Sequence, residues 1–139
     1  MFDSVGPHVV MAASSDENHP PENITDGNTK TFWISTGMFP QEFVLRFAEP
    51  TQISGVTVDS YNVKHLKIDK NTTQQASQFE PVAEKEILKP LVFMLFFQLN
   101  GSSATQLRFI IASGYDHFVS VHRVTFFIPH LTVSTNFTS

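Results

Sequence analysis

Hydrophobic and polar residues alternate with a period of two along several short stretches of this chain. Such alternation is typical of strands that have one buried side and one solvent-facing side. The buried sides predicted in this way are Phe43, Leu45 and Phe47 in one strand, Leu107, Phe109 and Ile111 in a second, and Val124, Phe126 and Ile128 in a third.

The segment 52–60 breaks this alternation. Ile53 is out of step with Val56 and Val58, and Ser54-Gly55 lie where the parity changes. An extra residue on one strand of a pair causes such a change, so we predict a β-bulge at this point. A further, more polar strand is predicted over 63–70.

No stretch keeps a helical hydrophobic period, and Gly, Pro, Asn and Asp recur between the predicted strands. Short strands separated by such turn-forming residues favour an antiparallel β-sandwich or jelly roll, so we predict an all-β fold. The length of 139 residues suits a single domain over 1–139, with 1–7 and 131–139 as loose tails.

The run of seven apolar residues from Leu91 to Phe97 has no alternation at all. It is too short to cross a bilayer as a helix, which takes about 20 residues. The favoured interpretation is a strand that is covered on both faces. The alternative is an exposed sheet edge that binds a partner or another copy of the chain.

Charge and cysteine content exclude several classes of function. The net charge is −4 and there is no run of Lys and Arg, which argues against a nucleic-acid partner. The absence of cysteine excludes disulfides, thiolate zinc sites and cysteine nucleophiles, and it favours a reducing compartment. The first residues lack the basic region of a signal peptide, so we expect a cytoplasmic chain and interpret the four Asn-X-Ser/Thr triplets as chance.

The polar segment "HPPENITDGNTKTFW" (residues 19–33) is the strongest candidate for chemistry. Asn23, Asp26, Asn28 and Thr31 would present several oxygens within one tight bend, and calcium takes about six to eight oxygen ligands. The segment is not an EF-hand, because that alignment places a tryptophan at the position of the bidentate glutamate. A solvated turn whose side chains bond their own backbone explains the same residues. Trp33 is interpreted as a core anchor with a bonded indole N–H.

The string "SGYDHFVSVH" brings Ser113, Asp116, His117, Ser120 and His122 close together in sequence. A catalytic triad is defined by spatial geometry, and adjacent residues of a strand point to opposite faces. We therefore predict no enzymatic activity.

The strings "HPPEN", "DGN", "TFW", "TGMFPQEF" and "LRFII" resemble the discoidin, or galactose-binding-like, domain family over about Ala12 to Val124. They resemble a ciliary-transport branch of that family more closely still. This resemblance implies an eight-stranded jelly roll without catalysis, in the cytoplasm and cilium. It also implies membership of the intraflagellar transport B complex, with a Rab-like small GTPase as the direct partner and other complex B subunits around it. A carbohydrate- or lipid-binding module is the alternative within the wider family.

By the same resemblance, a calcium site maps onto the polar segment, with Asn23, Asp26, Asn28 and Thr31 as ligands. Many relatives complete this site with a glutamate from the last strand, where this chain has Phe126 and Phe127. With one charged ligand, weak calcium binding is expected. The apolar run at 91–97 and the tail from 126 also depart from the family pattern.

Overall fold

The fold is taken from a computed structural model, which describes residues 7–14, 18, 24, 33–35, 38–72, 78–88, 93–116, 118–128 and 131–134. This part of the chain forms eight β-strands, and none of it forms a helix that could span a membrane. The strands are β1 (His8–Ala12), β2 (Trp33–Ile34), β3 (Gln41–Tyr61), β4 (Val63–Asn71), β5 (Glu80–Glu86), β6 (Met94–Gly114), β7 (Ser120–Ile128) and β8 (Leu131–Ser134).

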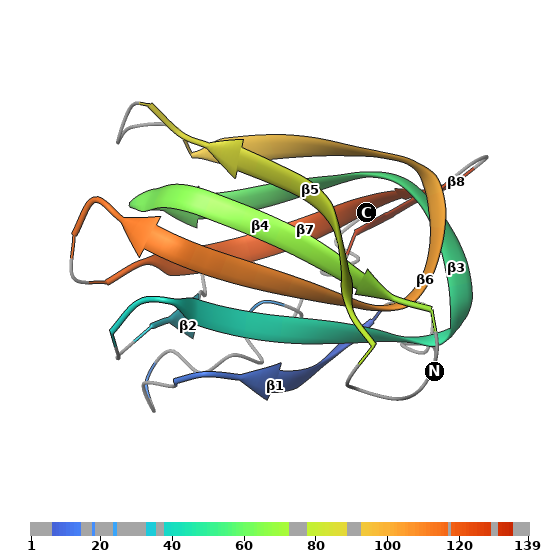
Figure 1. The fold of residues 1–139 in the computed structure, drawn as a ribbon, viewed down its shortest axis with the longest axis horizontal. Coiled ribbons are helices and arrows are strands. Elements are labelled where there is room, and N and C mark those ends of the chain that lie inside the picture. The colour runs from blue at the N-terminus through green and yellow to red at the C-terminus, as the bar shows by residue number, and fades with distance from the viewer. Residues whose placement is uncertain are drawn as a thin grey trace.

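All of the strand pairs are antiparallel, and they form one sheet in the order β2-β7-β3-β6-β4-β5, with β1 paired to β3 and β8 to β7. The long strands β3 and β6 turn together at the right of Figure 1 and pass from one layer to the other. The sheet thereby folds over itself. The predicted all-β sandwich is confirmed.

The two layers differ in their strands. In the first layer, residues 41–46 of β3 pair with β1 on one side and with residues 106–111 of β6 on the other, and β4 and β5 follow. In the second layer, residues 55–61 of β3 lie between β7 and the first residues of β6. The registers of β3 shift between these two parts, and one shift falls between Ile53 and Gly55. The predicted bulge is therefore confirmed.

The core lies between the layers and is rich in aromatic side chains. Phe43 stacks on Phe109 at 4.8 Å between ring centroids, and the edge of Trp33 packs on Phe43 at 5.4 Å. Phe47 contacts Phe126 in the same edge-on manner at 5.0 Å. The residues predicted to be the buried sides of three strands are buried, except that Ile128 is only half-buried.

Two predictions need correction: one about the burial of the apolar run, and one about the C-terminal tail. In the apolar run, Leu95 and Phe97 are buried whereas Met94 and Phe96 are exposed, so the strand is not covered on both faces; Leu91 and Val92 lie outside the described residues. At the C-terminal end, Leu131–Ser134 are not loose, because they pair with β7 as β8. A sheet edge supplies backbone hydrogen bonds to any adjacent extended segment, which explains the ordering of these four residues.

We expect Phe109→Ala to lower the free energy of unfolding by about 3–5 kcal/mol, because it removes a fully buried ring and leaves a cavity against Phe43. Phe118→Ala is the matched control, since this ring is 43% exposed and its loss should cost about 1 kcal/mol or less. Urea denaturation measures both. Equal destabilisation by the two changes would contradict the described core.

Candidate functional site

The predicted cation ligands Asn23, Asp26, Asn28 and Thr31 lie outside the described residues. The structure therefore places only Ile24, within the polar segment, and Trp33, at its C-terminal end. Ile24 is 1% exposed and belongs to the core cluster, and Trp33 is fully buried at the other end.

Trp33 is a structural anchor, as predicted. Its indole Nε1–H donates to the carbonyl oxygen of Ser14 at 2.9 Å. The one polar atom of this buried side chain therefore has a hydrogen-bond partner. β2 pairs with β7, and the next residue is bonded just before β7: the Ser35 amide donates to the carbonyl of Val119, and the Val119 amide donates back to Ser35 Oγ. The polar segment is thus held at its C-terminal end by core packing and by the sheet.

The end of β7 offers no carboxylate to this segment. Phe126 is fully buried in the core, and Phe127 packs edge-on against Phe96 at 6.0 Å. Within the described ranges, no three His, Cys, Asp or Glu side chains gather in a group that could hold a metal ion.

The Ser/His/Asp string is spread over two strands and a turn. Ser113 lies on β6 opposite His65, and Asp116 lies exposed in the turn before β7, whereas His117 falls outside the described residues. Ser120 Oγ lies 3.4 Å from His122 Nε2, and the imidazole packs edge-on against Phe93 at 5.2 Å. Ser120 is 5% exposed, so its hydroxyl does not face an open cleft.

An apolar patch lies on the outer side of the second layer and extends to the residues just after β5; we define it as Leu88, Met94, Phe96 and Phe127. Leu88, Met94 and Phe96 are 81%, 60% and 48% exposed. The ring of Phe96 lies over Gly55, where an added Cβ would come within 2.9 Å of it. The absence of a side chain at Gly55 thus leaves the space that the ring of Phe96 occupies.

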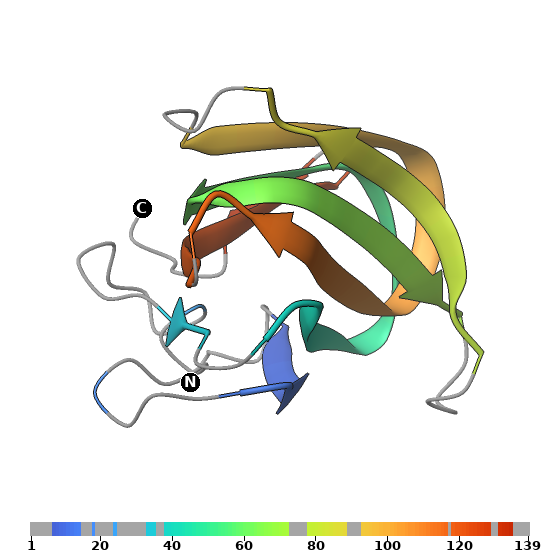
Figure 2. The ribbon, with the colours of Figure 1, turned by 60° about the vertical axis from the view of Figure 1, so that its left-hand side comes forward.

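The patch borders an open sheet edge. Residues 94–98 of β6 pair with β3 on one side. β5 runs alongside the other side in Figure 2 without pairing to it in the described part of the chain. A groove lined by Ile87, Leu88, Met94 and Phe96 separates the two strands, and Lys85 Nζ crosses it to the carbonyl of Phe96 at 2.6 Å. Exposed apolar side chains beside an unpaired edge are typical of protein-binding surfaces.

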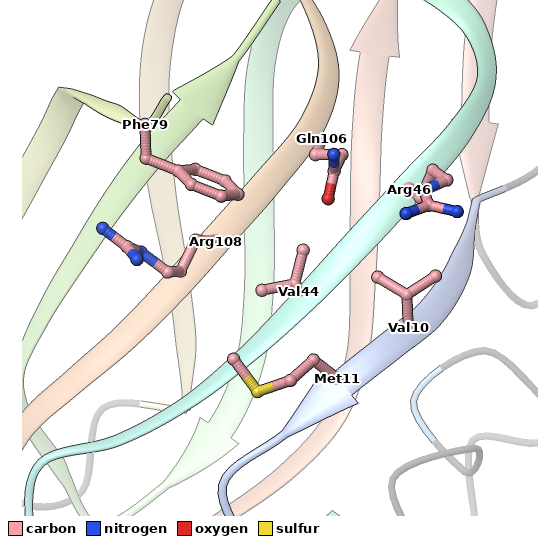
Figure 3. A pocket seen from close by; sticks show the side chains of 7 residues that line it. All are labelled: Val10, Met11, Val44, Arg46, Phe79, Gln106 and Arg108. Carbon is pink, nitrogen blue, oxygen red and sulfur yellow. The ribbon is translucent and has the colours of Figure 1, made fainter. Parts of the chain in front are cut away.

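A second hollow lies on the outer side of the first layer; we call it the arginine pocket (Figure 3). Its volume is about 200 Å³. Val44 and Gln106 lie at its floor, on neighbouring strands. The pocket is lined by Val10, Met11, Val44, Arg46, Phe79, Gln106 and Arg108.

The sequence of this chain matches the F5/8 type C domain family over residues 10–113. The human protein named intraflagellar transport protein 25 homolog is 47% identical over 124 residues, covering 88% of this chain and 86% of the human one. The protein of the same name from Mus musculus is 44% identical over 132 residues, covering 94% and 91% of the two chains.

Solved structures show the same fold at much lower identity. The CBM32-3 domain of a family 31 glycoside hydrolase from Clostridium perfringens superposes with a TM-score of 0.77 at 16% identity, covering 91% of this chain and 94% of that one. The family 32 CBM of NanJ from C. perfringens, in complex with galactose, gives 0.74 at 14% identity, covering 86% and 98%. Likeness at this level of identity concerns architecture alone. From its identity to the human and mouse proteins, this chain belongs to the intraflagellar transport protein 25 family, which is built on the F5/8 type C domain.

Proposed function

We propose that this chain is a non-catalytic subunit of the intraflagellar transport B complex, which binds a Rab-like small GTPase and supports the transport of ciliary cargo. The observation that carries the proposal is the identity of 43–47% to proteins named intraflagellar transport protein 25 from human, mouse and Chlamydomonas reinhardtii. This level of identity extends over 84–94% of the chain. The chain would act in the cytoplasm and the cilium.

The apolar patch is the surface that suits the GTPase best. Leu88, Met94 and Phe96 expose large apolar side chains that gain free energy when water is excluded, at about 25 cal/mol per Å². Phe96 is held in place by Phe127 beside it and by Gly55 below it. A preordered aromatic side chain loses little entropy on binding, which is why such residues are frequent at the centres of interfaces.

The groove beside the patch adds hydrogen-bonding capacity to this surface. Lys85 is the side chain that bonds the carbonyl of Phe96, and it is exposed. A flexible lysine on a sheet edge hinders indiscriminate strand pairing. It also leaves a specific partner free to displace it and take the same carbonyl as an acceptor.

We also propose a weak calcium site formed by Asn23, Asp26, Asn28 and Thr31. Support comes from the oxygen-rich composition of the segment and from the burial of two of its residues, Ile24 within it and Trp33 at its C-terminal end. Calcium would supply a cross-link between backbone and side-chain oxygens. Because Phe126 and Phe127 replace an acidic ligand on β7, Asp26 would be the single charged ligand and the affinity low.

Met94→Asp should weaken the complex with the Rab-like GTPase by tenfold or more, since a charge buried at the centre of an apolar interface costs roughly 2 kcal/mol or more. The variant and the unchanged chain are each co-expressed with the GTPase, and the heterodimer is measured by gel filtration and calorimetry.

Met38→Asp is the matched control for this change. Met38 is 88% exposed and lies outside the apolar patch, so its replacement should leave the affinity unchanged. Failure of the unchanged chain to form a heterodimer would refute the adaptor function. Equal binding by both variants would instead remove the apolar patch from the interface.

Calcium at millimolar concentration should raise the melting temperature of the chain, and Asp26→Ala should abolish this rise. A ligand present at a hundred times its dissociation constant adds about 2.7 kcal/mol to the free energy of unfolding. Glu49→Ala serves as control, because it removes one exposed carboxylate on β3 and should leave the rise intact. If calcium leaves the melting temperature of each of the three proteins unchanged, the site does not exist.

A further inference from the structure

The arginine pocket has an apolar floor on the outer side of a sheet, where polar residues are the rule. Phe43 and Leu45 point into the core, so Val44 between them points outwards, yet it is only 5% exposed. Val10 and Met11 of β1 and Phe79 before β5 stand around it (Figure 3). Water at this floor is therefore in contact with apolar walls and is easily displaced.

Gln106 brings an unused hydrogen-bond donor to this floor. The residue is 2% exposed, and its Nε2 has no hydrogen-bond partner among the described residues. It lies opposite Arg46 on β3 and opposite Asn71 on β4. A buried donor left without an acceptor is destabilising, so this amide favours any ligand that brings an oxygen to it.

Arg108 is held rigidly at one side of the pocket. Its Nη2 donates to Asp69 Oδ2 at 2.8 Å, and its guanidinium lies 4.5 Å from the centre of the Phe79 ring. Its Nε is 3.8 Å from Glu42 Oε1, too far for a hydrogen bond, and is buried without a partner in the described part of the molecule. Asp69 and Glu42 together carry one negative charge more than Arg108 balances, and neither accepts a hydrogen bond from this buried Nε–H.

Arg46 brings a second positive charge, so that the two arginines and the two carboxylates of the pocket balance. It is exposed at the rim, and none of the ion pairs found within the described ranges includes it. Together, Arg46, Gln106 and Arg108 give the pocket three donors, and Arg46 is the guanidinium that has no ion-pair partner among the described residues. A single carboxylate is the matching ligand group, because it has acceptors only and pairs well with a guanidinium.

The size and the charge balance restrict the ligand further. About 200 Å³ is smaller than the pockets of roughly 300–1,000 Å³ that hold free cofactors and drug-sized molecules. Asp69 and Glu42 beside Arg108 would repel a phosphate group more strongly than a single carboxylate, because phosphate carries more negative charge. The pocket therefore fits one carboxylate side chain, with a small apolar side chain against Val10 and Met11.

We propose that the arginine pocket binds an acidic side chain, flanked by an apolar residue, on an extended segment of a partner protein. The pocket lies on the outer side of the first layer and the apolar patch on the outer side of the second. Both surfaces can therefore be occupied at once. The chain would bridge two proteins, one held by apolar burial and the other by charge-assisted hydrogen bonds.

The test uses the whole chain labelled with ¹⁵N and two blocked peptides, acetyl-Val-Glu-Val-Glu-Val-amide and its isosteric Gln counterpart. The Glu peptide should cause saturable shifts of the Gln106 side-chain amide and of the Arg46 and Arg108 Nε–H resonances. The Gln peptide should bind roughly tenfold more weakly, since it lacks the charge. Free acetate, which lacks the apolar side chains, should bind more weakly still.

Two variants separate the pocket from general charge attraction. Arg46→Ala should weaken binding of the Glu peptide by about tenfold, whereas Lys67→Ala, which removes one positive charge from a nearby exposed position on β4, should leave it unchanged. Equal effects of the two changes, equal binding of the two peptides, or acetate binding as tightly as the Glu peptide would each overturn the proposal. So would the absence of any shift at Gln106.

Gln106→Met provides a second, independent readout. Removing an unsatisfied buried amide at nearly constant volume should leave the urea midpoint unchanged or raise it, while binding of the Glu peptide is lost. A clear fall in the urea midpoint would show that the amide serves the fold rather than a ligand, and it would contradict the proposed role. Retained binding by a folded Gln106→Met protein would contradict it equally.

Discussion

The antiparallel pairing of β3 with β6 is the interaction on which the rest of this structure depends. Each strand has 21 residues, and the two remain paired in both layers, from Gln41 opposite Ile111 to Asp59 opposite Met94. Because they turn the corner together, each of them contributes residues to both layers (Figure 1). The shifts in register at the corner set which side chains of each layer face the core.

This pairing also determines both candidate surfaces. In the first layer it puts Phe43 and Phe109 inside and leaves Val44, Arg46 and Gln106 on the outer side. In the second layer it puts Leu95 and Phe97 inside and leaves Met94 and Phe96 outside. A slip of one residue would exchange the inner and outer sets, exposing phenylalanines and burying an arginine, so the register is strongly specified. The core and the surfaces therefore follow from one constraint.

The sequence predicted the strands that have one solvent-exposed face and one buried face. Strands such as 42–47 and 121–128 alternate because each is half-buried, and the bulge near Gly55 was visible as a change of parity. β1 and β5 escaped prediction because most of their residues are exposed or half-buried, so neither carries an amphipathic pattern. The prediction that the run at 91–97 is covered on both faces was wrong for the opposite reason. Apolar side chains on both faces erase the alternation, and only the packing of β6 shows which face is buried.

The candidate sites were less accessible to sequence reasoning. Trp33 could be identified as a core anchor because one large ring closes a polar segment, and the cation ligands at 23–31 remain a prediction. The arginine pocket left no local signal, since Val10, Val44 and Gln106 come from three strands and polar residues on an outer face usually signify solvent. Only the register of β1, β3 and β6 brings them together.

Nuclear Overhauser contacts between the backbone protons of β3 and β6 test the central claim most directly. The account predicts cross-strand contacts in both layers, between residues 43 and 109 and between residues 56 and 97, with a break in the ladder between Arg46 and Thr51. Contacts in one layer alone, or a ladder displaced by one residue, would contradict it.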